Sequence, residues 1–169
     1  MSAPPEQLAE LAAKLQRLED IEAIKWLITR YAQGADDGND INVMLPLFTD
    51  DIVFAAEGLG RFEGKAAVRE MLLGSPAFIR RTLHYMVSPA INIAKEGQTA
   101  QAFWYLWETA EMPKAQGGEW EPVWIGGTYE TELVKTREQW QLRKVTLKLK
   151  LVSPYADGWV KTPVRSFAQ

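Results

Sequence analysis

The stretch WQLRKVTLKLKLV at residues 140–152 alternates apolar and polar side chains along most of its length. A period of two predicts a β-strand with one face in the core and the other in water. Leu142 is out of phase with this run, which predicts a β-bulge near Arg143. The apolar side chains are Val145, Leu147, Leu149 and Leu151, and the polar ones are Lys144, Thr146, Lys148 and Lys150.

Three preceding segments have the same strand character. Residues 84–94, 99–111 and 123–136 are rich in Val, Ile, Thr, Trp and Tyr, and turn formers separate them. The segment at 99–111 is apolar on both faces, so we expect it to be a central strand covered on both sides. The second half of the chain therefore predicts a sheet of long strands joined by short turns.

The first half predicts helices. Leucines recur every three or four residues between Leu8 and Leu18, and Asp20 is placed to cap a second helix at Ile21 to Gln33. The leucine segment packs either on its own domain or on another subunit. Shorter elements follow: a helix at 41–48, a strand at 52–55, a hairpin at 58–64 and a helix at 65–73. Helices followed by long strands indicate an α+β fold, with helices laid across a strongly curved, mainly antiparallel sheet that encloses a pocket.

Composition limits the function. The 169 residues fit one domain at 20–152, preceded by a helix at 1–19 and followed by a C-terminal arm at 153–169 that is a possible lid. There are no cysteines and one histidine, so we expect no metal site, and a net charge of −3 argues against nucleic acid. No signal sequence or membrane-spanning run is evident, so a cytoplasmic protein that does not bind membranes is expected.

His84 is the first candidate for catalysis, because an imidazole titrates near neutral pH. Asp36 or Asp37 could orient it and stabilise its charged form. Each also has a structural reading: a satisfied histidine in a strand, and a turn rich in Asp, Gly and Asn. Tyr31 could direct a hydroxyl into the pocket or be a core tyrosine. Glu108 is the one charge on an apolar strand face, so it is either functional or at the point where the strand leaves the core.

Tryptophans are unusually frequent, with seven in the chain. Those in or near the predicted strands, including Trp104 and Trp124, could line a cleft for a flat or polycyclic hydrophobic ligand. An aromatic core is the alternative. No phosphate-binding loop and no nucleophile elbow is present.

Several motifs follow one another along the chain: DIEAIK at 20–25, Tyr31, Asp36, LFTDDIV at 47–53, FEG at 62–64 and His84. In this order they resemble the SnoaL-like branch of the NTF2-like superfamily, most closely the bile acid 7α-dehydratase and scytalone dehydratase group. The resemblance implies that His84, Asp36 and Tyr31 are catalytic, and that Glu108 stands where the bile acid enzyme has an acidic residue. The second histidine of scytalone dehydratase has no counterpart, and the region expected to carry a pocket tyrosine reads Val53-Phe54-Ala55, without a hydroxyl.

The resemblance implies a cofactor-independent lyase, most simply a dehydratase of a hydrophobic hydroxylated ring compound. Phe54, Trp104, Trp124 and Glu108 are then the expected substrate contacts. An isomerase or a formaldehyde-releasing carbon–carbon lyase could use the same residues, and a noncatalytic binding or assembly subunit of this fold is a further alternative. A homo-oligomer, dimer or trimer, is expected.

Overall fold

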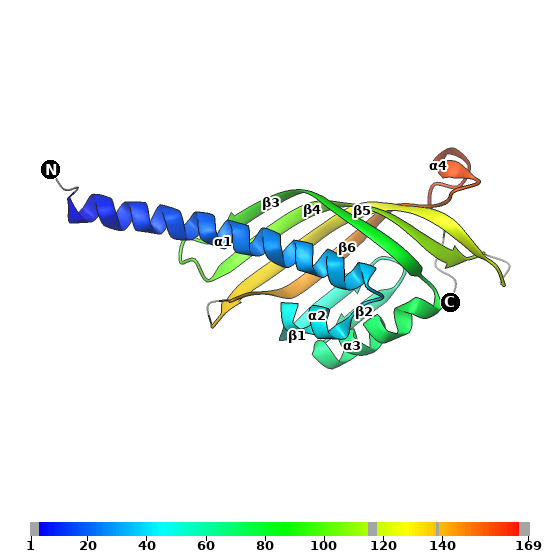
Figure 1. Ribbon diagram of the computed structural model, residues 1–169, viewed down its shortest axis with the longest axis horizontal. Coiled ribbons are helices and arrows are strands. Elements are labelled where there is room, and N and C mark those ends of the chain that lie inside the picture. The colour runs from blue at the N-terminus through cyan, green and yellow to red at the C-terminus, as the bar shows by residue number, and fades with distance from the viewer. Residues whose placement is uncertain (1–3, 115–117, 138, 166–169) are drawn as a thin grey trace.

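A computed structural model describes residues 4–114, 118–137 and 139–165. One long helix and two short ones accompany a six-stranded sheet, and a last helical turn follows it (Figure 1). The helices are α1 (Pro5–Asp36), α2 (Ile41–Met44), α3 (Lys65–Gly74) and α4 (Gly158–Lys161), with 3-10 turns at Leu45–Leu47 and Ser75–Ala77. The strands are β1 (Phe48–Ala56), β2 (Gly60–Glu63), β3 (Arg80–Ile93), β4 (Thr99–Pro113), β5 (Trp120–Thr136) and β6 (Gln139–Pro154).

The sheet has the strand order β2-β1-β6-β5-β4-β3 and is not closed. Its pairs are antiparallel except β1 with β6, which run parallel. The C-terminal half of α1 lies across one face, where Ile24, Ile28 and Tyr31 are buried (Figure 1). The predicted α+β architecture, with helices on a curved and mainly antiparallel sheet, is confirmed.

Two irregularities in β6 accompany the curvature of the sheet. Glu132 pairs with Lys144 but Leu133 pairs with Leu142, so Arg143 has no paired residue on β5 and forms the predicted bulge. A second shift lies opposite Gly126 and Gly127. A Cβ at Gly127 would collide with the carbonyl oxygen of Lys148, so only glycine allows the two strands to approach so closely there.

The first helix does not break at Asp20, so the prediction of two helices with Asp20 as a cap is wrong. Asp20 is buried in the middle of α1. Its carboxylate lies 2.9 Å from Lys135 Nζ and accepts a hydrogen bond of 3.0 Å from Trp140 Nε1. Burial raises the pKa of Asp20, but these two partners outweigh it and hold the pKa below the ordinary value. The acid therefore fastens α1 to β5 and β6.

The prediction that the strand at 99–111 is covered on both sides is also wrong for the single chain. β4 lies between β3 and β5, and its Trp104 face is buried. On the opposite face Tyr105 is 51% exposed and Trp107 is 37% exposed. No helix of the described residues covers these rings, because α1 packs on the other face of the sheet.

Candidate active site

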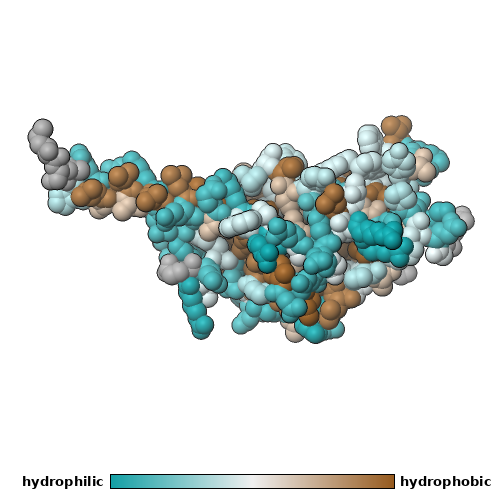
Figure 2. Space-filling view, in the orientation of Figure 1, coloured by the Kyte–Doolittle hydropathy of each residue, from teal (hydrophilic) through white to brown (hydrophobic). Residues whose placement is uncertain are grey.

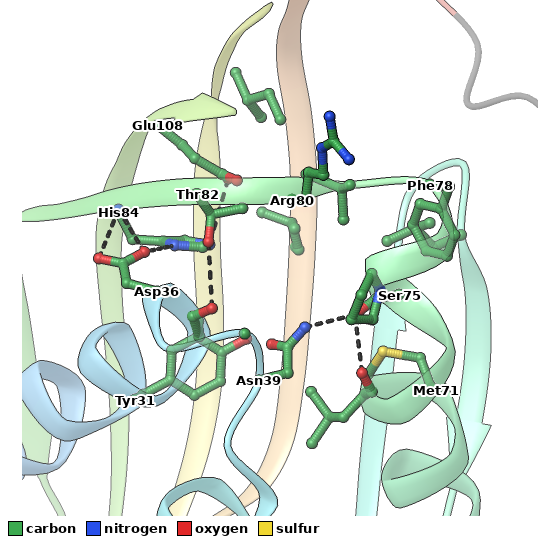
Figure 3. A pocket seen from close by; sticks show the side chains of 18 of the residues that line it. Tyr31, Asp36, Asn39, Met71, Ser75, Phe78, Arg80, Thr82, His84 and Glu108 are labelled. Carbon is green, nitrogen blue, oxygen red and sulfur yellow. Dashed lines mark hydrogen bonds and ion pairs between the residues drawn. The ribbon is translucent and has the colours of Figure 1, made fainter. Parts of the chain in front are cut away.

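A cavity of about 150 Å³ lies between the concave face of the sheet, the C-terminal end of α1 and α3. Its walls are largely apolar. Tyr31, Asp36, His84 and Glu108 reach it from α1, β3 and β4 (Figure 3). The structure thus brings four of the residues singled out in the sequence to one place. The apolar walls include Phe54, Leu59, Met71, Leu72, Ile79, Ile125, Leu147 and Leu149.

Asp36 and His84 are in direct contact. Asp36 is the last residue of α1, and its Oδ1 lies 2.6 Å from Nδ1 of His84. Both oxygens of the same carboxylate accept the backbone N–H of His84, at 3.0 and 3.2 Å. Asp36 therefore holds the end of α1 against β3 and also orients the imidazole ring. A carboxylate can only accept, so Nδ1 carries the proton and Nε2 of a neutral ring is free to act as a base. Neighbouring Asp37 is exposed and makes no such contact.

Glu108 lies on the other side of the imidazole. It is the cross-strand partner of His84, and its Oε2 is 3.4 Å from His84 Nε2. The side chain is 5% exposed, and its Oε1 is buried without a hydrogen-bond partner in the described residues. A buried oxygen of this kind is costly unless a ligand or a proton satisfies it. Glu108 is therefore not a residue at the point where the strand leaves the core.

The pKa values of this cluster are shifted. Burial raises the pKa of Glu108 to about 7, with His84 opposing the shift and Asp36 adding to it. For His84, burial lowers the pKa, but the hydrogen bond to Asp36 and the charges of Glu108 and Asp36 outweigh it, so the net pKa is raised. A carboxyl that titrates near neutral pH thus lies beside an imidazole whose pKa is raised.

Tyr31 reaches the cavity from α1 and is paired with Tyr129 of β5. Burial raises the pKa of Tyr31 to about 12, with a hydrogen bond from Tyr129 opposing the shift and the charge of Glu108 adding to it. The rings meet edge to face, with centroids 5.9 Å apart. A hydroxyl can accept and donate at once, so Tyr31 can accept from Tyr129 while its own proton is donated to another group. Sequence reasoning missed Tyr129, although it has the same strand parity as Ile125.

Asn39 and Ser75 add a polar corner that sequence reasoning also missed. Ser75 Oγ donates to the carbonyl of Leu72 at 2.9 Å and accepts from Asn39 Nδ2 at 2.5 Å (Figure 3). Ser75 has only one proton, and it is donated to Leu72. The Asn39 side chain must therefore direct its NH2 group toward Ser75, which determines the orientation of the amide. Asn39 lines the cavity, and its Oδ1 is left as an acceptor. The turn formers around Asn39 gave no sign of this role, since the partner lies 36 positions away.

Two tryptophans expected to contact substrate do not line this cavity. Trp104 is buried behind it, where it stacks on Tyr129 with ring centroids 5.3 Å apart. Trp124 belongs to the opposite face of the sheet and stacks on Trp107. Successive strand residues face opposite ways, so Ile125 faces the cavity and Trp124 cannot. Of the three aromatic residues predicted to contact substrate, Phe54 alone lines the cavity.

The C-terminal arm does not close the cavity within residues 153–165. It follows the ends of β5 and β6, where Tyr155 lies against Trp124 and Arg165 binds Glu121 at 2.6 Å. The remainder of the expected lid, residues 166–169, lies outside the described residues. Within the described part of the chain, no helix is long and apolar enough to cross a membrane, and no three His, Cys, Asp or Glu residues gather as metal ligands.

Solved structures share this architecture. A proposed aromatic ring hydroxylase from Novosphingobium aromaticivorans is 27% identical, with a TM-score of 0.70 over 83% of this chain and 96% of that one. A hexachlorocyclohexane dehydrochlorinase, LinA type 2, is 17% identical, with a TM-score of 0.76 over 92% and 97%. A proposed scytalone dehydratase from N. aromaticivorans is 19% identical, with a TM-score of 0.74 over 91% and 95%.

No functionally curated protein matches the chain. The sequence of residues 16–146 does match a family, the SnoaL-like domain, and this range includes α1 from Gln16 onward and most of the sheet. It contains Tyr31, Asp36, His84 and Glu108 of the cavity. The chain therefore belongs to the SnoaL-like domain family.

Proposed function

We propose that this protein is a cofactor-independent lyase that dehydrates a hydrophobic, hydroxylated ring compound. One observation carries the proposal: His84 lies in an apolar cavity between a carboxylate that orients it and a buried glutamic acid. Removal of water needs a base for the proton and an acid for the leaving hydroxyl. These two groups are adjacent here.

His84 is the base. With Nδ1 bound to Asp36, Nε2 of the neutral ring takes a proton from a substrate carbon next to an activating carbonyl. The electron pair of the broken C–H bond moves toward that carbonyl and forms an enolate. Asp36 then stabilises the imidazolium, which is the effect that already raises the pKa of His84.

Glu108 is the acid. With a pKa of about 7, a large share of the protein carries this carboxyl in its protonated form near neutral pH. The enolate electrons form the new double bond, the C–O bond breaks, and the leaving hydroxyl takes the Glu108 proton to become water. The His84 proton then returns to Glu108 across the 3.4 Å contact, so both groups regain their starting state.

Tyr31 and Asn39 position the substrate in this scheme. The Tyr31 hydroxyl, with a pKa of about 12, remains a neutral donor and hydrogen-bonds to the oxygen on which the enolate charge develops. Asn39 Oδ1 accepts from a second hydroxyl of the substrate. The apolar walls, Phe54 among them, bury the ring. Among structures of the same fold, the names dehydrochlorinase and dehydratase both denote eliminations, which supports this reaction class.

Incubating the full chain with a panel of β-hydroxy ketones on one- and two-ring scaffolds tests the proposal. We expect at least one product that is lighter than its substrate by the mass of one water. Loss of formaldehyde or an unchanged mass would instead assign a carbon–carbon lyase or an isomerase.

His84→Ala is the matched control, and it should abolish product formation while leaving the circular dichroism spectrum unchanged. Turnover that survives His84→Ala would exclude this mechanism. If no compound of the panel binds or reacts, the noncatalytic alternative is favoured.

A further inference from the structure

We propose that the N-terminal half of α1 is a pairing surface for a second copy of this chain. Four leucines, which we call the leucine stripe, form it, and each is 54 to 64% exposed. Figure 2 shows apolar side chains gathered along the projecting helix. The arrangement that fits best is a parallel, in-register pair of α1 helices. The stripe consists of Leu8, Leu11, Leu15 and Leu18.

This part of α1 projects beyond the rest of the molecule (Figure 1). Every residue from 4 to 19 is exposed, and Arg17, which donates to the carbonyl of Ile93 at 2.9 Å, fastens the end of this segment to β3. An isolated helix this short is marginal in water, and most helices are stabilised by packing of an apolar face. A projecting helix with four exposed leucines thus requires a partner.

The partner cannot be the chain's own sheet. An α-helix advances about 100° per residue, so the centre of the stripe and the centre of the buried residues Ile24, Ile28 and Tyr31 lie about 150° apart around α1. Bending the helix toward the sheet would leave the leucines facing outward. The opposite placement also suits a pair, because two molecules joined along the stripes have their domains on the two outer sides, where they do not collide.

The spacing and charges favour a second copy in parallel. The leucines are separated by three, four and three residues, the a and d positions of two heptads. Lys14 then occupies a g position and Glu19 the e position five residues later, the pair that meets between chains in a parallel coiled coil. An antiparallel pair brings no opposite charges together at these positions. Three of the four leucines precede residue 16, where the family match begins, so most of the stripe lies outside the matched SnoaL-like domain.

Sedimentation equilibrium of the full chain over a concentration series tests the pairing. We expect self-association, and we expect Leu11→Glu/Leu15→Glu to weaken it at least about 100-fold, since a charge in an apolar seam is strongly unfavourable. Leu73→Glu changes an exposed leucine on α3 and should leave association unchanged. All three leucines changed here are exposed, so circular dichroism should show that both variants remain folded.

Charge exchange tests the orientation. Lys14→Glu should weaken association because it places like charges across the seam, and Lys14→Glu/Glu19→Lys should restore it. A wild-type chain that is monomeric throughout the series, or a dimer indifferent to Leu11→Glu/Leu15→Glu, overturns the proposal. A double exchange that fails to restore association overturns the parallel arrangement.

Discussion

His84 and Glu108 face each other across the β3–β4 pair with Nε2 and Oε2 3.4 Å apart, and each changes the proton affinity of the other. The charge of Glu108 helps to raise the pKa of His84, and the charge of His84 lowers the pKa of Glu108, which burial has raised to about 7. Their protons therefore belong to a coupled pair. A base and an acid that lie this close together suit a reaction that needs both.

The first prediction concerns the pH dependence of turnover. The active form needs a neutral His84 and a protonated Glu108, so the rate should rise as His84 loses its proton and fall as Glu108 loses its own near pH 7. Glu108→Gln cannot transfer a proton, so it should lower kcat about 10²–10⁴-fold and remove the alkaline decline. Glu130→Gln, at an exposed glutamate of β5, is the control. A variant profile that keeps its full alkaline limb would assign that limb to another group.

The second prediction concerns stability. The folded pKa of Glu108, about 7, is above the ordinary value of 4.5, so the folded protein holds this proton more tightly than the unfolded chain. Stability from this group is present below pH 4.5 and is lost as the pH rises to about 7, at most about 3 kcal/mol. Glu108→Gln should accordingly raise the free energy of unfolding more at pH 8 than at pH 5 in urea titrations. An equal change at both values would show that Glu108 is ionised in the native state.

The third prediction separates two adjacent carboxylates. Asp36→Asn puts an amide group against Nδ1, which favours the imidazole tautomer whose Nε2 carries the proton and cannot act as a base. We expect kcat to fall about 10²–10⁴-fold. Asp37→Asn, at the exposed neighbour, should change it less than about twofold. If both variants lost kcat equally, the cause would be a disturbance of the C-terminal end of α1 and not a change in the orientation of His84.

Sequence patterns predicted much of this fold, because the burial of one face of a strand produces an alternation that can be read from neighbouring residues. The alternation in 140–152 identified β6 and its bulge at Arg143, since only one face of that strand is buried. The same logic singled out Glu108, the one charge on an apolar strand face. His84 and Asp36 were found from their chemistry and from a resemblance, and the structure placed them 2.6 Å apart.

Features that depend on distant partners were not predictable in this way. Asp20 has the same local signature whether it caps a helix or binds Lys135 and Trp140, which follow more than a hundred residues later. Trp124 and Ile125 are both apolar, so no alternation showed which of them faces the cavity. The orientation of Asn39 depends on Ser75 in another element. In each case the deciding contact is between segments that the chain brings together only on folding.

The fourth prediction tests the role of Asp20. If Asp20 capped a helix, Asp20→Ser would preserve stability, because serine is an equally good cap. In the structure it leaves Lys135, whose side chain is 8% exposed, without this carboxylate. Breaking a buried ion pair costs about 3–5 kcal/mol, so we expect a loss of that order in urea unfolding. Glu22→Ser, at an exposed position of the same helix, should cost less than about 1 kcal/mol. Equal stability of the Asp20 variant and the wild type would restore the cap interpretation.

The fifth prediction concerns Tyr31, which the proposal makes a neutral donor to the developing enolate. Removing one such donor costs about 10²–10³-fold in rate, so Tyr31→Phe should lower kcat by that amount. Because its pKa is about 12, the tyrosine does not titrate where His84 and Glu108 do, and the pH profile should keep its shape. Tyr129→Phe removes only the donor behind Tyr31 and should cost less. If Tyr129→Phe lowers kcat as much as Tyr31→Phe does, the two tyrosines act by supporting the cavity wall. Another group must then donate to the enolate.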